Sequence, residues 1–222
     1  MLGKRQGFGQ MALPPHNLTM TFIGAGMLWV GWFGFNAGSA LAADGNAGMA
    51  MLVTHLSAAA GCLTWSFIEW VRYGKPSALG AVTGMVAGLG TITPASGYVG
   101  PAGAMVIGLS AGFVCFYCTK IDDSLDVFPV HGVGGILGTF LAGIFASSEL
   151  GIFSGQGLAE GVTIAAQLKV QLIGIAATFA YTAVVSGILF FVIDKLIGLR
   201  VSADEEAQGL DITCHNEVGY DL

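Results

Sequence analysis

Charged side chains are scarce in this sequence. Asp, Glu, Lys and Arg make up only 10% of its 222 residues, whereas 54% are hydrophobic and the mean hydropathy is +0.74. A soluble domain carries about a quarter charged residues because water surrounds it on every side. The shortage of charge therefore excludes an ordinary soluble enzyme. The net charge of −6 comes largely from the tail after Arg200, and it argues against nucleic acid as a partner.

Cysteine is scarce as well, with four residues in the chain. Cys62, Cys115 and Cys118 lie in apolar stretches, where buried thiols are expected and a disulfide framework is not. Cys115 and Cys118 have no further Cys or His nearby, so the sequence predicts no metal site and no cofactor. The first residues, with Lys4 and Arg5 followed by Gly, Gln and Pro, lack the apolar core of a signal peptide.

Long apolar stretches are abundant in the chain. A membrane-spanning helix needs roughly 20 mostly apolar residues. Charge-free stretches that fit one helix each are 18–43, 47–68, 127–148 and 170–193. The stretch 76–119 is too long for one helix, and prolines and glycines in TITPASGYVGP break it into two. The sequence therefore predicts an all-α fold, a polytopic membrane helix bundle with six transmembrane helices. The 35 glycines are typical of closely packed membrane helices.

Basic residues predict the orientation of this bundle. Six spans place both ends of the chain on one side of the membrane, and Lys and Arg favour the cytoplasmic side. The residues that fall on one side are Lys4, Arg5, Arg72, Lys75, Lys120, Lys195 and Arg200. Lys169 alone falls near the other side, where a long side chain can reach the interface. We therefore expect a multi-pass protein of the cell (plasma or inner) membrane, with a cytoplasmic segment 1–17, a transmembrane domain 18–196 and a cytoplasmic tail 197–222.

His131 is the strongest candidate for a functional residue. It lies shortly inside the fifth predicted span, where a charged group costs about 2.5 to 3.5 kcal/mol on insertion scales. Gly132, Gly134 and Gly135 leave space around its ring. A histidine on an apolar face can also be a simple packing residue. We favour a functional role because imidazole is rare within membranes and titrates near neutrality unless burial lowers its pKa.

The first predicted span carries a second candidate group. Trp32, Phe35 and Ser39 are spaced so that they lie on one face of a helix, and Asn36 follows Phe35 directly. One interpretation is aromatic packing with a hydroxyl bonded back to the preceding turn. The other is a cation site, in which aromatic faces and a hydroxyl together offset the dehydration of a small cation. The residues alone leave both interpretations open.

Acidic residues precede the fifth predicted span. Asp122, Asp123 and Asp126 lie where the N-terminus of this helix emerges from the membrane. Capping and the helix dipole explain them without a role in transport. We therefore predict that Asp123 and Asp126 support the structure.

Several longer segments point to a family. They are PPHNLTM, GWFGFNAGSA, TPASGY, DDSLDVFPVHGVGG, AEGVT, and GLRV followed by EEAQGLD. In these segments, and essentially from end to end, the chain resembles the ammonium transporter family of Amt, Mep and Rh proteins. Members of this family have eleven spans, an outward N-terminus and two inverted five-helix halves. The chain is similar to spans six to eleven. Half of a pore wall would leave His131 facing lipid, so we expect these residues to be part of a longer protein.

The resemblance implies a homotrimer in which each subunit has its own narrow pore between its two halves. His131 matches the pore histidine of the second half, and its partner belongs to the first half. Phe35 matches one ring of a double phenylalanine gate, next to Trp32 on the substrate pathway. Ser39 matches the hydroxyl that holds ammonium at the outer vestibule.

The remaining matches concern support and regulation. Asp123 occupies the pseudo-symmetric place of a structural Asp in the first half, and Asp126 is expected at the cytoplasmic end. Asn36 is expected to support the pore. Pro129 stands where the family pattern has a glycine, which alters the local shape of the helix start. The resemblance further implies that the tail docks a PII-type signal protein.

Together these features predict a transporter and not an enzyme. Ammonium would suffer a large desolvation penalty in an apolar lumen, whereas ammonia would suffer little. We therefore expect deprotonation of ammonium at the pore mouth and conduction of ammonia past His131. The alternative is an ammonium sensor that binds ammonium without significant transport. A six-span channel of the aquaporin kind is disfavoured because no Asn-Pro-Ala motif occurs.

Overall fold

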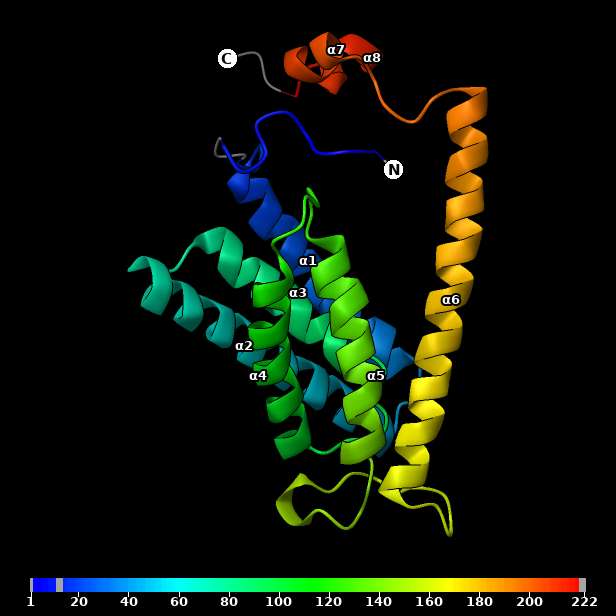
Figure 1. The fold of residues 1–222 in the computed structure, drawn as a ribbon. Helices are drawn as coiled ribbons and strands as arrows, with labels where there is room; N and C mark the ends of the chain where they lie inside the picture. Colours follow the sequence, from blue (N-terminus) through cyan, green and yellow to red (C-terminus); the bar gives the residue numbers. More distant parts are fainter. Residues whose placement is uncertain (1, 11–13, 220–222) are drawn as a thin grey trace. The chain divides into compact units, whose positions relative to one another are not determined.

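The computed structural model describes residues 2–10 and 14–219. The chain divides into two compact units, residues 15–176 and residues 1–14 with 177–222. Every secondary-structure element in the described residues is a helix (Figure 1). The elements are α1 (Leu18–Gly38), α2 (Gly45–Tyr73), α3 (Ala78–Ile92), α4 (Pro101–Cys118), η1 (Phe128–Val133), α5 (Gly134–Phe145), η2 (Gly151–Phe153), α6 (Ile164–Leu196), α7 (Ala203–Gln208) and α8 (Leu210–His215). The predicted all-α class is confirmed.

Five helical segments are long and apolar enough to cross a membrane. They are Leu18–Gly38, Gly45–Tyr73, Pro101–Cys118, Phe128–Phe145 and Ile164–Leu196. The sixth apolar helix is α3, which has 15 residues and is therefore shorter than a typical span. Helix α3 ends at Ile92 and α4 begins at Pro101, so the predicted break falls at residues 93–100, where Pro94 has no amide hydrogen to continue the helical hydrogen bonds.

Polar caps explain where the helices begin. The side chain of Asn17 accepts a hydrogen bond from the Met20 amide at the start of α1. Asp44 accepts hydrogen bonds from the amides of Asn46 and Ala47 at the start of α2. These bonds satisfy amides that have no partner within the first turn of a helix. Helix α2 then extends to Tyr73, beyond the predicted 47–68, and ends where Gly74 supplies the left-handed C-cap at φ 77°.

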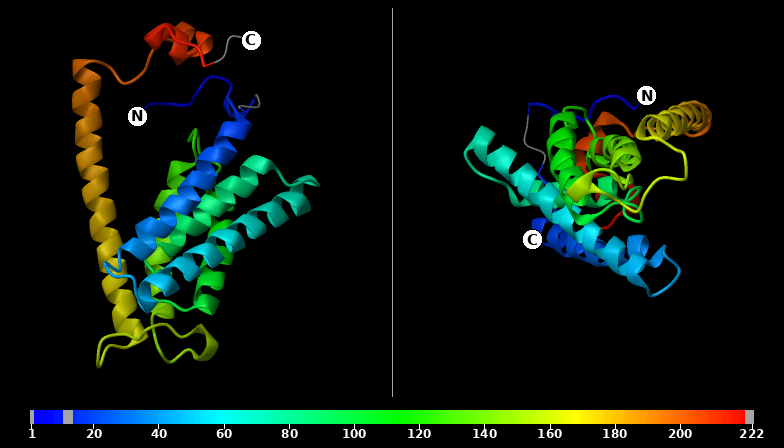
Figure 2. Two further views of the ribbon diagram at one scale, coloured as in Figure 1. Left: turned by 180° about the vertical axis from the view of Figure 1, so that it is seen from behind. Right: turned by 90° about the horizontal axis from the view of Figure 1, so that it is seen from below.

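Glycines bring α2, α3 and α4 close together. Helices α1, α2 and α3 lie side by side when seen from behind (Figure 2). A Cβ at Gly88 would overlap the Ser57 carbonyl oxygen, and a Cβ at Gly112 would lie 2.7 Å from the Gly61 carbonyl oxygen. The Ser57 hydroxyl donates a 2.8 Å hydrogen bond to the Gly88 carbonyl. Small residues therefore hold these helices at backbone contact, as in other membrane bundles.

A second packing region joins α3, α4 and α5. Its fully buried side chains include Ile92, Val99 and Ile107, and Phe145 packs against them. A Cβ at Gly138 would overlap the carbonyl oxygen of Thr91, so α5 also approaches α3 at backbone distance. These contacts fix the position of the segment that carries His131.

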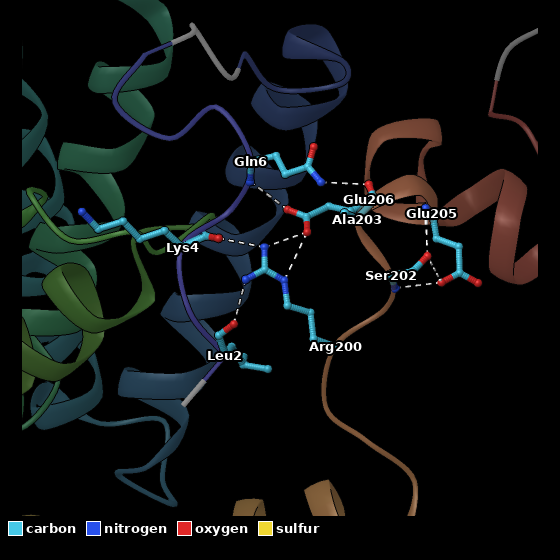
Figure 3. A network of polar contacts seen from close by, with 8 residues as sticks. All are labelled: Leu2, Lys4, Gln6, Arg200, Ser202, Ala203, Glu205 and Glu206. Carbon is cyan, nitrogen blue, oxygen red and sulfur yellow. Dashed lines mark hydrogen bonds and ion pairs between the residues drawn. The ribbon is translucent and has the colours of Figure 1, made fainter.

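The second unit contains the terminal clasp, which we define as Leu2, Lys4, Gln6, Arg200, Ala203 and Glu206 (Figure 3). Arg200 donates to the carbonyl oxygens of Leu2 (2.8 Å) and Lys4 (2.7 Å) and to the Glu206 carboxylate (2.7 Å). Gln6 donates its amide to Glu206 and its side chain to the Ala203 carbonyl. The predicted cytoplasmic tail therefore contains folded structure.

Helix α7 of the tail begins at a capping box. The Ser202 hydroxyl accepts a hydrogen bond from the Glu205 amide, and the Glu205 carboxylate accepts one from the Ser202 amide (Figure 3). The Ser202 hydroxyl also donates a 2.7 Å hydrogen bond to this carboxylate, and the hydrogen bonds from the hydroxyl and the amide lower the pKa of Glu205 below its ordinary value. This reciprocal pattern is a strong helix start signal in sequence.

Candidate functional site

Helix α1 carries Trp32 and Phe35 one turn apart. Their ring centroids are 6.0 Å apart and their planes meet at 74°, an edge-to-face arrangement. The Trp32 indole N–H donates a 2.7 Å hydrogen bond to the Thr93 hydroxyl, which itself donates to the Leu89 carbonyl. This hydrogen bond therefore holds the Trp32 ring of α1 against the end of α3. Phe35 is 63% exposed and extends from the same face.

His131 lies in η1, a π-helical turn that precedes α5. Its ring stacks against that of Trp32, with centroids 6.5 Å apart and planes at 8°. A Cβ at Gly90 would lie 3.8 Å from His131 Nδ1, so the glycine in α3 leaves room beside the imidazole. His131 is exposed in the described chain. Isolated π turns within α-helices occur frequently at functional sites.

Pro129 and Asp123 shape this turn. Pro129 has no amide hydrogen and stands near the start of η1, where such a hydrogen would lack a helical partner. The Asp123 carboxylate accepts a 2.7 Å hydrogen bond from the Phe128 amide. Asp126 has a left-handed backbone at φ 51°, and its carbonyl accepts the amide of Val130. Both acidic residues therefore lie at the helix start that positions His131.

Ser39 is at the C-cap of α1, one turn beyond Phe35. Its hydroxyl donates a 2.6 Å hydrogen bond to the Phe35 carbonyl, and its side chain is exposed. This is the bond that the packing interpretation predicts. The Ser39 hydroxyl can still bind a cation in this arrangement, because its oxygen keeps lone pairs that can accept a hydrogen bond from an N–H of the cation.

Asn36 faces away from this group and is buried. Its side-chain amide donates a 2.9 Å hydrogen bond to the Thr54 hydroxyl, which donates to the Ala50 carbonyl of α2. A buried amide that is paired in this way ties α1 to α2. Asn36 therefore contacts the protein interior, whereas the Phe35 ring is exposed.

The structure also adds residues that the sequence did not single out for this site. Thr93 orients Trp32, and its only sequence signal is a polar residue next to the break before Pro94. His55 of α2 lies 5.1 Å from the Trp29 ring and 6.0 Å from the Phe33 ring, in an apolar hollow of about 610 Å³. Trp29 and Phe33 are one turn apart on α1, a spacing that indicates a shared face. Among the described residues no group of three or more His, Cys, Asp or Glu could hold a metal ion.

Helices α1, α3 and the η1 turn thus bring an imidazole, an indole and a phenyl ring together along one side of the bundle. The sequence model of the Ammonium Transporter Family matches residues 1–220 of the chain. The chain belongs to the ammonium transporter family. The resemblance noted in the sequence is therefore confirmed.

Individual relatives agree with this assignment. Ammonium transporter Amt1 of Archaeoglobus fulgidus is 45% identical over 99% of the chain and 56% of its own length. The ammonium transporter of Bacillus subtilis is 40% identical over 99% of the chain and 55% of its own length. The chain thus spans about half the length of the curated ammonium transporters that it matches.

Solved structures of the family share the fold. A chain described as "Sensor Amt Protein" superposes with a TM-score of 0.83 and 32% identity, over 94% of this chain and 52% of its own. Mep2 of Saccharomyces cerevisiae superposes with a TM-score of 0.76 and 38% identity, over 86% of this chain and 45% of its own. Together with the apolar helices, membership of the ammonium transporter family makes the chain part of a multi-pass membrane protein.

Proposed function

We propose that the protein transports ammonium across the membrane, releasing a proton at the pore mouth and conducting neutral ammonia past His131. The observation that carries this proposal is the stack of His131 on Trp32, with Phe35 at the edge of the same indole, in a chain of the ammonium transporter family. A transport role also means that the protein does not act as an enzyme.

Desolvation explains why a proton would be released. An ion that enters an apolar lumen loses its hydration, and the penalty is far larger for a cation than for a neutral molecule. The exposed Phe35 ring and the Trp32 face present π-electrons to an incoming cation, and the Ser39 oxygen can accept one of its N–H groups. Beyond these rings an imidazole offers a nitrogen that accepts a hydrogen bond and relays a proton. Potassium has no proton to release and is rejected.

His131→Ala in the full-length protein tests this proposal. We expect slower ammonium uptake and altered membrane current, because the lumen loses its hydrogen-bonding imidazole. His55→Ala is the matched control, since it removes an exposed imidazole that packs on Trp29 away from Trp32. An unchanged uptake rate together with unchanged rejection of potassium in His131→Ala would remove His131 from the mechanism.

Ammonium sensing is a second candidate function, because one structure that superposes well is described as a sensor. A sensor would bind ammonium at Trp32, Phe35 and Ser39 without carrying it across. Uptake into vesicles distinguishes the two functions, since a sensor shows saturable binding with no flux above that of protein-free vesicles.

We further propose a homotrimer with one pore in each subunit and six spans between residues 18 and 196. In this topology residues 1–17 and 197–222 lie in the cytoplasm, as the one-sided distribution of Lys and Arg supports. Cys214 is exposed in the tail and serves as a probe. A membrane-impermeant thiol reagent should label it in inside-out vesicles and not in intact cells. The mass of the purified complex tests the trimer.

The tail is proposed to dock a PII-type signal protein. Helices α7 and α8 and the terminal clasp give residues 200–215 a folded surface for such a partner. Truncation after Arg200 should abolish binding of the signal protein while uptake is partly retained. Binding that survives the truncation would contradict this part of the proposal.

A further inference from the structure

Helix α6 carries all of its glutamine, threonine and serine side chains on one face. They are Gln167, Gln171, Thr178, Thr182 and Ser186, at successive spacings of 4, 7, 4 and 4 residues. At 3.6 residues per turn these positions fall within an arc of about 100°. Between residues 170 and 193 the opposite face is apolar and consists of Ile173, Ala176, Ala180, Val184, Gly187 and Phe191. We call the five polar positions the α6 polar stripe.

The hydrogen-bonding groups of the stripe lie in the most apolar of the five segments that can span a membrane. Within the part of the chain that the structure describes, none of the five side chains forms a hydrogen bond. A polar group in hydrocarbon costs free energy unless it is paired. Serine and threonine hydroxyls can bond back to the preceding turn, but a glutamine amide has two donors and one acceptor and needs further partners. The stripe is therefore suited to a protein surface and not to lipid.

The first end of the stripe packs against α5. A Cβ at Gly143 would lie 3.1 Å from the Cγ atom of Gln171 and 3.6 Å from that of Gln167. Ile173 and Val184 of the apolar face are 59% and 61% exposed. The side of α6 that contacts α5 is thus the polar side, and the apolar side is available to lipid.

The length of the stripe indicates what covers the rest of it. The stripe extends over 19 residues (186 minus 167). At 1.5 Å per residue this is about 28 Å, close to the thickness of the hydrocarbon core of a bilayer. We propose that the α6 polar stripe binds a membrane-spanning helix from the part of the same polypeptide that lies outside residues 1–222. Interhelical hydrogen bonds from the stripe then join α6 to that helix.

Two observations favour a helix of the same polypeptide over a helix of a second copy. The chain spans 56% and 55% of the length of two curated relatives, so those proteins contain further residues. The stripe also begins at the contact with α5, and a helix of a second copy would have to enter the subunit beside α5. Membrane helices are joined by small residues and by polar side chains, so the partner helix carries Gly, Ala, Ser, Thr, Asn or Gln toward α6.

Photocrosslinking in the full-length protein tests the proposal. A photoreactive phenylalanine analogue replaces Thr182 on the stripe or, as the matched control, Val184 on the apolar face. After illumination in membranes, mass spectrometry identifies the crosslinked peptides. We expect the analogue at Thr182 to react with a peptide of the same polypeptide outside residues 1–222, and we expect this product to be lost when the analogue is at Val184. Ser186 replaces Thr182 as the position of the analogue if the first variant is not folded.

A pair of substitutions of similar shape tests the polar character of the contact. Thr178→Val with Thr182→Val should lower the unfolding temperature of the full-length protein in detergent, because groups on the partner helix lose their hydrogen bonds. Val184→Thr is the control. It adds a hydroxyl to the apolar face, where the hydroxyl can bond back to its own helix, and it should leave the unfolding temperature unchanged.

The other outcomes would overturn the proposal. A crosslinked product of twice the chain mass would assign the stripe to a second copy, and a crosslink within residues 1–222 would assign it to a helix described above. Lipid adducts alone, in equal amounts at both positions, would show that the stripe faces the bilayer. Equal unfolding temperatures for the double variant and the control would show that the hydroxyls have no partner. Ammonium uptake is not measured, so the result is independent of the proposed transport function.

Discussion

At the scale of single residues, Trp32 depends on a polar neighbour that is distant in sequence. Its indole stacks on His131 and meets Phe35 edge to face, while its N–H is bonded to the Thr93 hydroxyl. An indole can rotate about two side-chain bonds, so the hydrogen bond selects the orientation in which the ring is parallel to the imidazole. Thr93 is therefore a positioning residue for the proposed pathway.

Thr93→Val should destabilise the protein by about 1 kcal/mol, because the Trp32 N–H loses its acceptor in a largely apolar environment. We also expect slower ammonium uptake, since the indole is no longer held against His131. Thermal unfolding in detergent and uptake into vesicles measure the two effects. Thr64→Val is the matched control, because the Thr64 hydroxyl bonds back to Ala60 of its own helix. Equal unfolding temperatures and equal uptake rates for the two variants would contradict the positioning role.

Part of this site follows from sequence and part does not. The spacing of Trp32, Phe35 and Ser39 within one span predicts a shared face, and His131 stands out as an imidazole in an apolar stretch. Neither pattern says that Thr93 bonds to Trp32 or that Asn36 turns inward to Thr54. Those contacts depend on how the helices are rotated, and rotation is set by packing.

At the scale of elements, the close approach of α2, α3 and α4 rests on particular glycines. Gly61, Gly84 and Gly88 lie where two helix backbones meet, and a methyl group at any of them would press on the facing chain. Other glycines, such as Gly174 in α6, have nothing within 4 Å of the Cβ position. Glycine content alone does not distinguish the two kinds, because both occur in apolar helices.

Gly88→Ala should destabilise the protein by about 1 to 3 kcal/mol, because the added methyl overlaps the Ser57 carbonyl and forces α2 away from α3. Gly174→Ala is the control, and it should leave stability unchanged or slightly raised through higher helix propensity. Thermal unfolding in detergent compares both with the unmodified protein. Equal unfolding temperatures would show that the contact between α2 and α3 accommodates a methyl group, so that the two backbones are not in direct contact at Gly88.

The π-helical turn η1 is a second feature at the scale of elements. The sequence predicts a helix beginning near residue 127 but not a wide first turn. Pro129 indicated an altered helix start. In the structure this start is the π turn before Gly134, and the turn holds the His131 ring toward Trp32. A π turn depends on the position of an entire helix, and local propensity does not encode it.

At the scale of the whole molecule, the clasp joins the first residues of the chain to the tail. Arg200 binds three acceptors that belong to residues 2, 4 and 206. The planar guanidinium has five N–H groups in a fixed fork, so one side chain can bridge all three acceptors. An exposed ion pair alone adds little stability, but the two backbone carbonyls make this contact more than a pair of charges.

Arg200→Lys should loosen the clasp while it keeps the charge, because an ammonium group cannot span the three acceptors. We expect faster amide hydrogen exchange in residues 3–8 and 203–208, with the transmembrane helices unchanged. Lys195→Arg is the control, since Lys195 contacts the Phe191 ring and not the clasp. Identical exchange in the clasp segments of Arg200→Lys and the unmodified protein would show that Arg200 does not hold them together.

The class of this protein, the approximate positions of its apolar helices and its family could all be predicted from the sequence. The class and the helix positions depend on local composition and length, because the bilayer demands about 20 apolar residues for each span whatever the rest of the chain does. The family depends on sequence segments such as GWFGFNAGSA. The hydrogen bond from Trp32 to Thr93, 61 residues away, and the stacking of His131 on Trp32 could be seen only in the folded structure. Such juxtapositions arise from the packing of helices that are far apart in the chain, where the glycine contacts set distance and rotation together.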